Sequence, residues 1–380
     1  MRILHIISGL NTGGAEIMLA RLCACLSELG FENRVVSLTG EGPVSEILRN
    51  SGVGIRTLGL RPGHATFAAW RELRSEVVDY CPSVVHGWMY HGGLAARSAV
   101  QRPRRPALVL GIHYSLIRLC EEKTMTRMVI RGLAWLSSSF DSICYVSEKS
   151  AAEHEAIGYS PVRRRVIPNG IDCSFFRPTE DLRQETRAEL GLRSTDLVIG
   201  MLARYHPMKN FPRFFAAAKR LAARHPEARF MCAGRGVDWS NGELTRIIRE
   251  AEVESRTLLL GECADVKPLL AAMDIATLSS SWGEAFPLSL AEAMSMGVPC
   301  VGPVIGDIPN LIGDPSLLVP PDGVSSLYEA WARLAAMGEG GRRAIGERAR
   351  RRVEERYSLN EGSRRYAALY ADAVADSRSN

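Results

Sequence analysis

Two glutamates lie eight positions apart in an otherwise small and apolar stretch, SWGEAFPLSLAEAMSMGVPC, residues 281–300. Pro287 predicts a helix that starts just after Glu284, and Gly297 is its natural end. Glu284 is then expected in the preceding loop and Glu292 within the helix. A buried carboxylate is costly unless it has a partner. We therefore expect either that Glu292 lies on an exposed helix face or that both acids reach a cleft and accept hydrogen bonds from a polyol ligand.

Two cations, Arg204 and Lys209, follow an apolar run in the stretch LVIGMLARYHPMKNFP. We expect a strand that ends at Ala203 and a helix that starts near Pro212, because proline suits a first helical turn. Cations between the carboxyl end of a strand and a helix amino terminus suit a diphosphate, since arginine can bond two oxygens and lysine adds a point charge. Alternatively, both are solvated loop charges.

Two glycines, Gly13 and Gly14, follow the first apolar run in SGLNTGGAE. They are expected to open the first helix, where free backbone amides can face an anion. The spacing is G-x-x-x-G-G, which differs from the G-x-G-x-x-G of a dinucleotide site, and no Walker Lys-Ser/Thr pair follows. A tight strand–helix turn without a ligand is the alternative.

Short apolar runs alternate with helical patterns along the whole chain, which favours parallel sheets covered by helices. The expected strands are residues 2–8, 33–38, 83–88, 107–113 and 142–147 in the first half and 197–203, 229–234, 257–262, 275–280 and 298–303 in the second. We therefore expect an α/β protein with two doubly wound, Rossmann-like domains. Such sheets bind ligands at the carboxyl ends of their strands, so a cleft between two facing domains is expected.

A turn-rich and then charged stretch, IPNGIDCSFFRPTEDLRQETRAELGL, marks the boundary between these domains. The prediction is a first domain at residues 1–172, a linker at 173–192 and a second domain at 193–356. Residues 357–380 are expected to form a closing helix that packs back on the first domain.

The composition is that of an ordinary globular protein, with 380 residues, 46% hydrophobic and 23% charged. No apolar run approaches the roughly 18 residues that a membrane span needs. The nine cysteines form no C-x-x-C pair, so we expect reduced thiols and a cytoplasmic protein. The early apolar run fits a first strand better than a signal peptide, because a Gly-rich turn and Glu16 follow it.

The net charge of +5 is mild and does not by itself indicate a nucleic-acid binder. Its distribution is uneven: residues 1–180 carry 21 Lys and Arg against 16 Asp and Glu, and the rest of the chain carries 26 of each. An excess confined to the first half suits contact with an anionic membrane surface or a lipid phosphate.

The segment EAFPLSLAE resembles the E-x7-E signature of retaining glycosyltransferases of the GT4 type, which have the two-domain GT-B fold. The resemblance covers nearly the whole chain, because further segments occur in the family's order: GGAE, VIPNGID, ARYHPMK and AMSMGVPCVG. Two departures are present. Ala203 precedes Arg204 where the family has glycine, and Asn310 stands where the family often has an acid.

The resemblance implies a role for each candidate residue. Arg204 and Lys209 would bind the donor diphosphate and stabilise it as a leaving group. Glu284 would contact the donor sugar, Glu292 the ribose hydroxyls, and His113 the region of the transferred sugar. The residues expected at the donor are Gly13, Gly14, Arg204, Lys209, Glu284, Ala285, Phe286, Pro287, Leu288 and Glu292.

The implied reaction moves a hexose, with retention, from a nucleoside-diphosphate sugar to a hydroxyl group. A UDP-sugar is favoured and a GDP-sugar is the alternative donor. The expected acceptor is a glycan or lipid-linked glycan in surface-polysaccharide biosynthesis. Two other interpretations stay open: a GT-B epimerase or phosphorylase, and a non-catalytic protein that binds sugar nucleotides.

Neither a metal nor another cofactor is expected, because the chain has no D-x-D motif and no evident His/Asp cluster. Arg204, Lys209 and helix amino termini would supply the electrostatic stabilisation instead. Glu284 could act as a nucleophile, whereas the resemblance implies front-face substitution in which the departing phosphate assists deprotonation of the acceptor.

One helix has a basic amphipathic pattern, KTMTRMVIRGLAWL, with Lys123, Arg127 and Arg131 at intervals of four. Such a helix can lie on an anionic membrane, or it can pack its apolar face into the domain core. The basic runs at 102–105 and 163–165 belong to the same half. A place on the inner face of the cytoplasmic membrane is therefore a candidate location.

Overall fold

The computed structural model describes residues 1–61, 64, 66–101, 106–116, 119 and 124–379. The chain divides into two compact units. The first comprises residues 1–170 together with 359–380, and the second comprises residues 171–358. The basic run at 102–105 and Lys123 lie outside the described residues.

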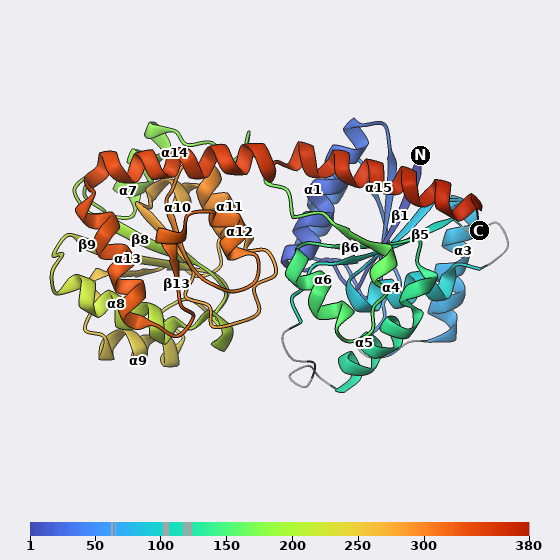
Figure 1. The fold of residues 1–380 in the computed structure, drawn as a ribbon, viewed down its shortest axis with the longest axis horizontal. Helices are drawn as coiled ribbons and strands as arrows, with labels where there is room; N and C mark the ends of the chain where they lie inside the picture. Colours follow the sequence, from blue (N-terminus) through green and yellow to red (C-terminus); the bar gives the residue numbers. More distant parts are fainter. Residues whose placement is uncertain (62–63, 65, 102–105, 117–118, 120–123, 380) are drawn as a thin grey trace. The chain divides into compact units, whose positions relative to one another are not determined.

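The first unit alternates strands and helices (Figure 1). Its strands are β1 (Arg2–Ile7), β2 (Glu32–Ser37), β3 (Gly54–Thr57), β4 (Val84–Trp88), β5 (Ala107–Ile112), β6 (Ser142–Tyr145) and β7 (Arg164–Val166). Its helices are α1 (Gly14–Glu28), α2 (Pro43–Asn50), α3 (Phe67–Tyr80), α4 (Met89–Ala99), α5 (Thr124–Leu136), α6 (Glu148–Glu155) and α15 (Leu359–Ser379), with short 3-10 turns at Ser137–Ser139 and Pro161–Arg163.

The strands of this unit form one parallel sheet in the order β3-β2-β1-β4-β5-β6-β7. Every residue of β4, β5 and β6 is buried, as expected for a parallel sheet with helices on both faces. The chain reverses its direction of winding between β1 and β4. The carboxyl ends of these neighbouring strands therefore flank a ligand-binding crevice in this fold class.

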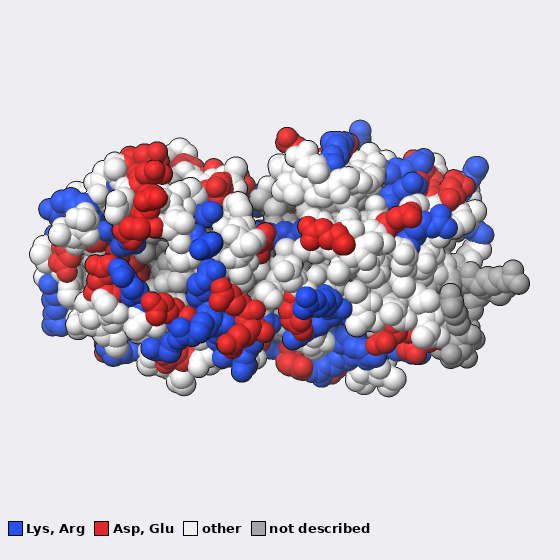
Figure 2. All heavy atoms as spheres, turned by 90° about the horizontal axis from the view of Figure 1, so that it is seen from above, with Lys and Arg blue, Asp and Glu red and all other residues white. Residues whose placement is uncertain are grey.

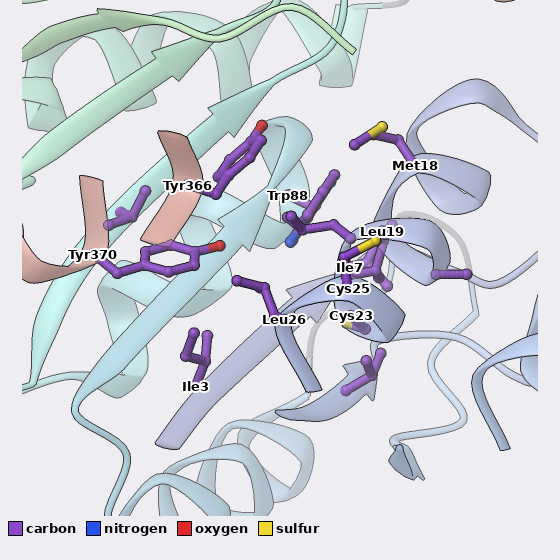
Figure 3. Packing of buried hydrophobic residues seen from close by; sticks show 14 of the residues in the cluster. Ile3, Ile7, Met18, Leu19, Cys23, Cys25, Leu26, Trp88, Tyr366 and Tyr370 are labelled. Atoms are coloured by element: carbon purple, nitrogen blue, oxygen red, sulfur yellow. The ribbon is translucent and has the colours of Figure 1, made fainter. Parts of the chain in front are cut away.

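The last helix, α15, packs into the core of the first unit. Its residues Tyr366 and Tyr370 lie in the same hydrophobic cluster as Ile3 of β1, Leu26 of α1 and Trp88 of β4 (Figure 3). A second cluster covers the opposite face of the sheet with side chains of α3, α4 and α5. The C-terminal segment thus completes one of the two cores of the first unit.

The second unit repeats the alternation. Its strands are β8 (Leu197–Leu202), β9 (Ala228–Ala233), β10 (Thr257–Leu259), β11 (Ile275–Thr277), β12 (Cys300–Pro303) and β13 (Leu318–Val319). Its helices are α7 (Glu180–Glu189), α8 (Phe211–Ala222), α9 (Gly242–Glu250), α10 (Lys267–Ala272), α11 (Leu288–Ser295), α12 (Ile308–Ile312), α13 (Val324–Ala336) and α14 (Gly338–Arg356), with 3-10 turns at Pro207–Lys209, Glu254–Arg256 and Pro315–Leu317.

These strands form a parallel sheet in the order β10-β9-β8-β11-β12-β13. Winding reverses between β8 and β11, and in this fold class ligands bind beside the loops that follow such a pair of strands. The expected fold class, two doubly wound α/β domains, is confirmed.

Residues 173–192 belong to the second unit, contrary to the expected linker. The reason is α7, which is fixed to the start of β11 by two arginines. Arg183 and Arg187 each donate to the Asp274 carboxylate at 2.6 Å. Arg187 is buried and also bonds the carbonyl of Ala272 at 3.1 Å. A segment held by buried ion pairs to the sheet is part of the domain.

Within the described part of the chain, no helix combines the length and the apolar character that crossing a bilayer requires.

Candidate functional site

Two loops at the reversal point of the second unit are tied together by hydrogen bonds. One loop follows β8 and the other follows β11. The backbone N–H of Ser281 donates to the carbonyl of Met208 at 2.9 Å, and Asn210 Nδ2 donates to Ser281 Oγ at 2.8 Å. Ser279 Oγ donates to the carbonyl of Lys209 at 2.7 Å. Residues far apart in the sequence are thereby held at one edge of the sheet.

Lys209 and Glu284 form an ion pair across these loops. Lys209 Nζ lies 2.5 Å from Glu284 Oε1, and the side chains are 14% and 7% exposed. Ser280 Oγ donates to the same carboxylate oxygen at 2.5 Å. Charge-assisted hydrogen bonds of this kind are short and strong, and few water molecules can compete for them in a largely buried place. The pair fixes the ammonium and the carboxylate relative to each other.

Asn210 supports this arrangement through its backbone and its side chain. Its φ of +49° lies in the left-handed region, which asparagine tolerates better than most residues. Its Oδ1 accepts the backbone N–H of Arg213 at 3.1 Å and caps α8. The sharp turn before α8 therefore ends the segment that carries Lys209 in a defined orientation.

Arg204 follows β8 by two positions and is exposed. In the described part of the chain it forms no ion pair. Its loop is closely packed at the backbone, since a Cβ on Gly234 would lie 2.3 Å from the Ala203 carbonyl oxygen. Burial lowers the pKa of His206, and the positive charges of Arg204 and Lys209 lower it further. The charges of both cations are therefore felt at His206, and the exposed Arg204 is accessible to an anionic ligand.

The loop around Glu284 is also closely packed. Gly283 has φ +80°, and a Cβ there would meet Met208 Sδ at 2.3 Å. Gly306, which follows β12, has φ +55°, and a Cβ there would lie 1.5 Å from the Glu284 carbonyl oxygen. Both positions require glycine for their backbone conformation and for their contacts. The position of Glu284 is therefore set by three loops.

Two residues of this site were not singled out from the sequence. Ser280 bonds Glu284, and Asp307 follows the glycine that touches the Glu284 backbone. Burial raises the pKa of the Asp307 carboxyl to about 6, although Asn310 Nδ2 donates to it at 2.8 Å and opposes the shift. A raised carboxyl pKa beside a candidate site marks a functional candidate. In the sequence, Asp307 could have been noticed in the segment VIGDIPN.

Glu292 is buried in α11 and is only 8% exposed. The interpretation that placed it on an exposed helix face is therefore wrong. The helix begins at Leu288, four residues after Glu284, and ends before Gly297, whose φ is +72°. Most neighbours of Glu292 along α11 are apolar and buried, because this helix packs against both the sheet and α14.

The remaining residues of the EAFPLSLAE segment connect the loop to the helix. Ala285, Phe286 and Pro287 are buried, and Leu288 is half-buried at the first helical position. The Phe286 ring lies 5.5 Å from the ring of Tyr357. These residues place the backbone between Glu284 and Glu292 in the interior of the second unit.

Gly13 and Gly14 lie at the amino terminus of α1 in the first unit, as expected, after the carboxyl end of β1. The carboxylate of Glu16 folds back over this terminus, since a Cβ on Gly13 would lie 2.3 Å from Glu16 Oε2. Burial raises the pKa of Glu16, and a hydrogen bond from its own backbone N–H opposes this shift. An anion at these amides would meet the Glu16 carboxylate.

His113 follows β5 and is held on three sides. Its Nδ1 is hydrogen-bonded to Asn169 Oδ1 at 3.0 Å, its ring stacks on Trp88 at 4.7 Å, and its backbone N–H donates to Met89 Sδ at 3.2 Å. Met89 has a φ of +58°, a strained conformation of the kind that clusters at functional sites. Burial lowers the pKa of His113 to about 4. The imidazole is therefore neutral at neutral pH.

The two ring nitrogens of His113 differ in their surroundings. Because an amide oxygen accepts hydrogen bonds, Nδ1 carries the proton with this orientation of Asn169. Nε2 is buried and finds no hydrogen-bond partner within the described residues; a Cβ on Gly111 would lie 3.6 Å from it. Asn169 was not singled out from the sequence, although it lies in the segment VIPNGID.

The other two histidines considered have different surroundings. His86 is fully buried, and its Nδ1 is hydrogen-bonded to the hydroxyl of Tyr370 in α15 at 2.8 Å. His91 is exposed on α4. The structure thus favours a structural role for His86 and a solvated one for His91.

Chemically, the second unit offers an exposed guanidinium and a buried ammonium–carboxylate pair at one edge of its sheet. Such a set can bind an anion with the cations and accept hydrogen bonds from hydroxyl groups with the carboxylate. No cluster of three or more His, Cys, Asp or Glu side chains suited to a metal ion occurs among the described residues.

Two family models match the chain in succession. Residues 12–175 match the model described as Glycosyltransferase Family 4, and residues 196–337 match Glycosyl transferases group 1.

Two similar proteins of known sequence are glycosyltransferases by name. The chain is 27% identical over 237 residues to the UDP-Gal:alpha-D-GlcNAc-diphosphoundecaprenol alpha-1,3-galactosyltransferase of Escherichia coli, a match that spans 61% of this chain and 59% of that protein. It is 26% identical over 359 residues to EpsF of Bacillus subtilis, which is named as a glycosyltransferase, with 91% of each chain covered.

Solved structures share the fold. The Anabaena protein Alr3699/HepE, in complex with UDP and glucose, superimposes with a TM-score of 0.83 at 19% identity over 97% of this chain and 99% of that chain. Sucrose-phosphate synthase of Thermosynechococcus elongatus gives 0.80 at 18% identity, with 99% of this chain and 100% of that chain covered. Taken with the two matched domains, these likenesses show the GT-B fold, and residues 12–175 and 196–337 form domains that match glycosyltransferase families.

Proposed function

We propose that the protein is a retaining glycosyltransferase that moves a hexose from a UDP-sugar to a hydroxyl group of a glycan or lipid-linked glycan. The observation that carries this proposal is the Lys209–Glu284 pair at the reversal point of the second sheet, with Arg204 exposed beside it. A GDP-sugar is the alternative donor. The UDP preference draws support from the names of the E. coli relative and the HepE complex.

In this proposal, Arg204 and Lys209 hold the donor diphosphate. The bond between the sugar C1 and the phosphate oxygen breaks, and a bond between C1 and the acceptor oxygen forms on the same face. The acceptor proton passes to the departing phosphate oxygen. Negative charge grows on the diphosphate during this step, and cations that are fixed beforehand stabilise it without reorganisation. The reaction would need no metal.

The carboxylates have separate roles in the proposal. Glu284 accepts hydrogen bonds from the hydroxyls of the donor sugar and keeps the Lys209 ammonium in place. Glu292 takes the ribose hydroxyls. In the first unit, a neutral His113 can form hydrogen bonds near the transferred sugar but does not supply a positive charge at neutral pH. The backbone amides of Gly13 and Gly14 face the donor phosphate or the acceptor.

The proposed cellular location is the inner face of the cytoplasmic membrane. Support comes from the positive excess of the first half of the chain and from the lipid-linked acceptor in the name of the E. coli relative. Surface-polysaccharide biosynthesis is the proposed process.

The test is saturation-transfer NMR on the purified protein, with EDTA present, against UDP-, GDP- and ADP-sugars. We expect selective binding of one donor that is lost in Arg204→Ala and kept in Arg348→Ala, which removes an exposed arginine of α14 in the same unit. We also expect Glu284→Gln to lower transfer by about 100-fold or more, as loss of a fixed electrostatic contact does. Binding of no donor by a folded protein would contradict the proposal.

A further inference from the structure

Helix α5 is fixed to the first unit by one face. Ile130, Leu133 and Ala134 are buried in the core beside the sheet. Tyr159 Oη donates to the carbonyl of Ile130 at 3.2 Å. The expected packing of this helix into the domain core is therefore found. Because this face packs into the core, the opposite face of the helix lies at the surface.

That opposite face carries large apolar side chains. Met125 and Met128 are each 56% exposed, and Trp135 is 84% exposed. Their positions follow the spacing of one helix face, and Gly132, at the remaining position of this stripe, has open space around it. We name Met125, Arg127, Met128, Arg131 and Trp135 the α5 surface. Single exposed apolar residues are ordinary, but a contiguous stripe marks an interaction site.

A further exposed apolar side chain lies on a turn joined to the end of this helix. The backbone N–H of Ser160 donates at 2.9 Å to the hydroxyl of Ser137, which directly follows α5. The turn that starts here carries Val162, which is 80% exposed. Val162 is thus an exposed apolar side chain on a turn that is hydrogen-bonded to the end of α5.

The charged residues of α5 itself are both arginines. Residues 124–136 contain Arg127 and Arg131 and no acid, and the attached turn and strand add the arginines at 163–165. Arg164 is paired with Glu148 and Glu155, but no ion pair engages Arg127 or Arg131 in the described part of the chain. On the face of the first unit that Figure 2 shows, by contrast, basic and acidic side chains are intermingled.

We propose that the α5 surface is a docking surface for an anionic lipid bilayer. Exposed methionine and tryptophan side chains would enter the boundary between headgroups and acyl chains, where tryptophan is enriched. Arg127 and Arg131 would meet the lipid phosphates. This inference rests on the proposed function, because a lipid-linked acceptor lies at such a surface, and it names the element that makes the contact.

The test is co-sedimentation of the full chain with vesicles of phosphatidylcholine, with and without phosphatidylglycerol. We expect binding to the anionic vesicles that weakens as salt is raised. Arg127→Gln with Arg131→Gln should weaken it about 25-fold, since each cation at such a surface contributes about fivefold. Met128→Ser with Trp135→Ser should weaken binding about fivefold or more to the same vesicles.

Matched variants control for the loss of charge and of apolar area. Arg71→Gln with Arg364→Gln removes two exposed arginines elsewhere in the first unit, and Phe67→Ser removes a 72% exposed ring on α3. Both control proteins should bind anionic vesicles as the unchanged protein does. Equal losses in the control and α5 variants would overturn the assignment of this surface.

Other outcomes separate this inference from the proposed function. No binding of the unchanged protein to anionic vesicles, with donor binding intact by NMR, overturns the docking surface and leaves the transferase proposal standing. Equal binding to neutral vesicles overturns the role of the arginines. A dimer that dissociates on Trp135→Ser, measured by analytical ultracentrifugation, would show that a second copy covers the surface, and it overturns the membrane assignment.

Discussion

Lys209 Nζ and Glu284 Oε1 lie 2.5 Å apart, although 75 positions separate the two residues in the sequence. Each side chain is largely buried, so each charge depends on the other for compensation. Ser280 adds a third group to the same carboxylate oxygen. In the proposed function, a cation that is already neutralised in the resting protein would be shared with a diphosphate when the donor binds, and the carboxylate would turn to the sugar hydroxyls.

We expect strong coupling between these two residues in a double-mutant cycle. Lys209→Met and Glu284→Gln should each lower the free energy of unfolding by about 3 kcal/mol, because each leaves a buried charge without its partner. The loss of unfolding free energy in the double variant should be about 1–3 kcal/mol smaller than the sum of the losses in the two single variants. Urea unfolding of the four proteins measures this.

Glu329→Gln is the matched control for this cycle, since its carboxylate is exposed on α13 of the same unit. Combined with Lys209→Met, it should give additive effects. Additive effects for the Lys209–Glu284 cycle itself would contradict the buried pair.

Gly306→Ala should damage the site through the backbone. The new Cβ would lie 1.5 Å from the Glu284 carbonyl oxygen, and the φ of +55° is unfavourable for alanine. We expect a loss of about 1–3 kcal/mol of stability and at least tenfold lower donor affinity, because the loop that carries Glu284 must move. Thermal unfolding and donor titration by NMR measure the two effects.

Gly242→Ala provides the comparison, because no atom lies within 4 Å of its Cβ position at the start of α9. It should bind donor as the unchanged protein does. If Gly306→Ala bound donor equally well, the contact between Gly306 and Glu284 would have no part in the site.

Most strands of both sheets could be predicted from the sequence because their apolar runs are continuous. The strands that were not predicted are short and lie at sheet edges: β3 (Gly54–Thr57), β7 (Arg164–Val166) and β13 (Leu318–Val319). In β7 two of three residues are arginines, a composition that local propensity assigns to a loop. Pairing with a neighbouring strand decided their conformation.

The site residues divide in the same way. The positions of Arg204 and Lys209 were predictable because they follow an apolar strand, and that of Glu284 because it precedes a helix. The start of α11 was placed too early. The loop that carries Glu284 continues to Pro287 and contacts Gly306, which belongs to a separate segment of the sequence. Asn169 could not be connected with His113 for the same reason, because 56 positions lie between them. The burial of Glu292 could not be predicted, because the spacing of apolar residues does not show that α11 packs against both the sheet and α14.

Asp307 should make the stability of the second unit depend on pH. Its carboxyl pKa is about 6 in the folded protein and about 3.8 in a free side chain, so the folded state binds its proton more tightly. This contribution is complete below about pH 3.8 and is lost as the pH rises through 6. Asp307→Asn removes the titration. The unfolding free energy of Asp307→Asn minus that of the unchanged protein should therefore be about 2 kcal/mol larger at pH 7.5 than at pH 4.5.

Urea unfolding of both proteins at the two pH values measures this difference. Effects of the substitution that do not involve titration cancel, because the same pair of proteins is compared twice. A difference that is constant with pH would show that the Asp307 carboxyl titrates in its ordinary range.

The first unit should lose stability in acid for the opposite reason. Burial lowers the pKa values of His5, His113 and His154 to about 4, and it lowers that of His86 well below 6.5. The unfolded chain takes up protons on these groups below about pH 6.5, whereas the folded unit resists until about pH 4, so stability falls as the pH drops through this range. At pH 5 the expected cost is about 2 kcal/mol for each histidine with a pKa of about 4.

His154→Gln isolates one of these contributions. His154 bonds the Tyr90 hydroxyl through Nε2 at 2.8 Å and the Ser150 carbonyl through Nδ1 at 2.7 Å, and a glutamine amide can both accept and donate. Hydrogen exchange of the β1 and β6 amides at pH 7 and pH 5, corrected for intrinsic rates, measures the stability of the unit. The loss between these pH values should be about 2 kcal/mol smaller in His154→Gln. An identical loss in both proteins would show that His154 is not held neutral by burial, and the acid sensitivity would then have to come from the remaining histidines alone.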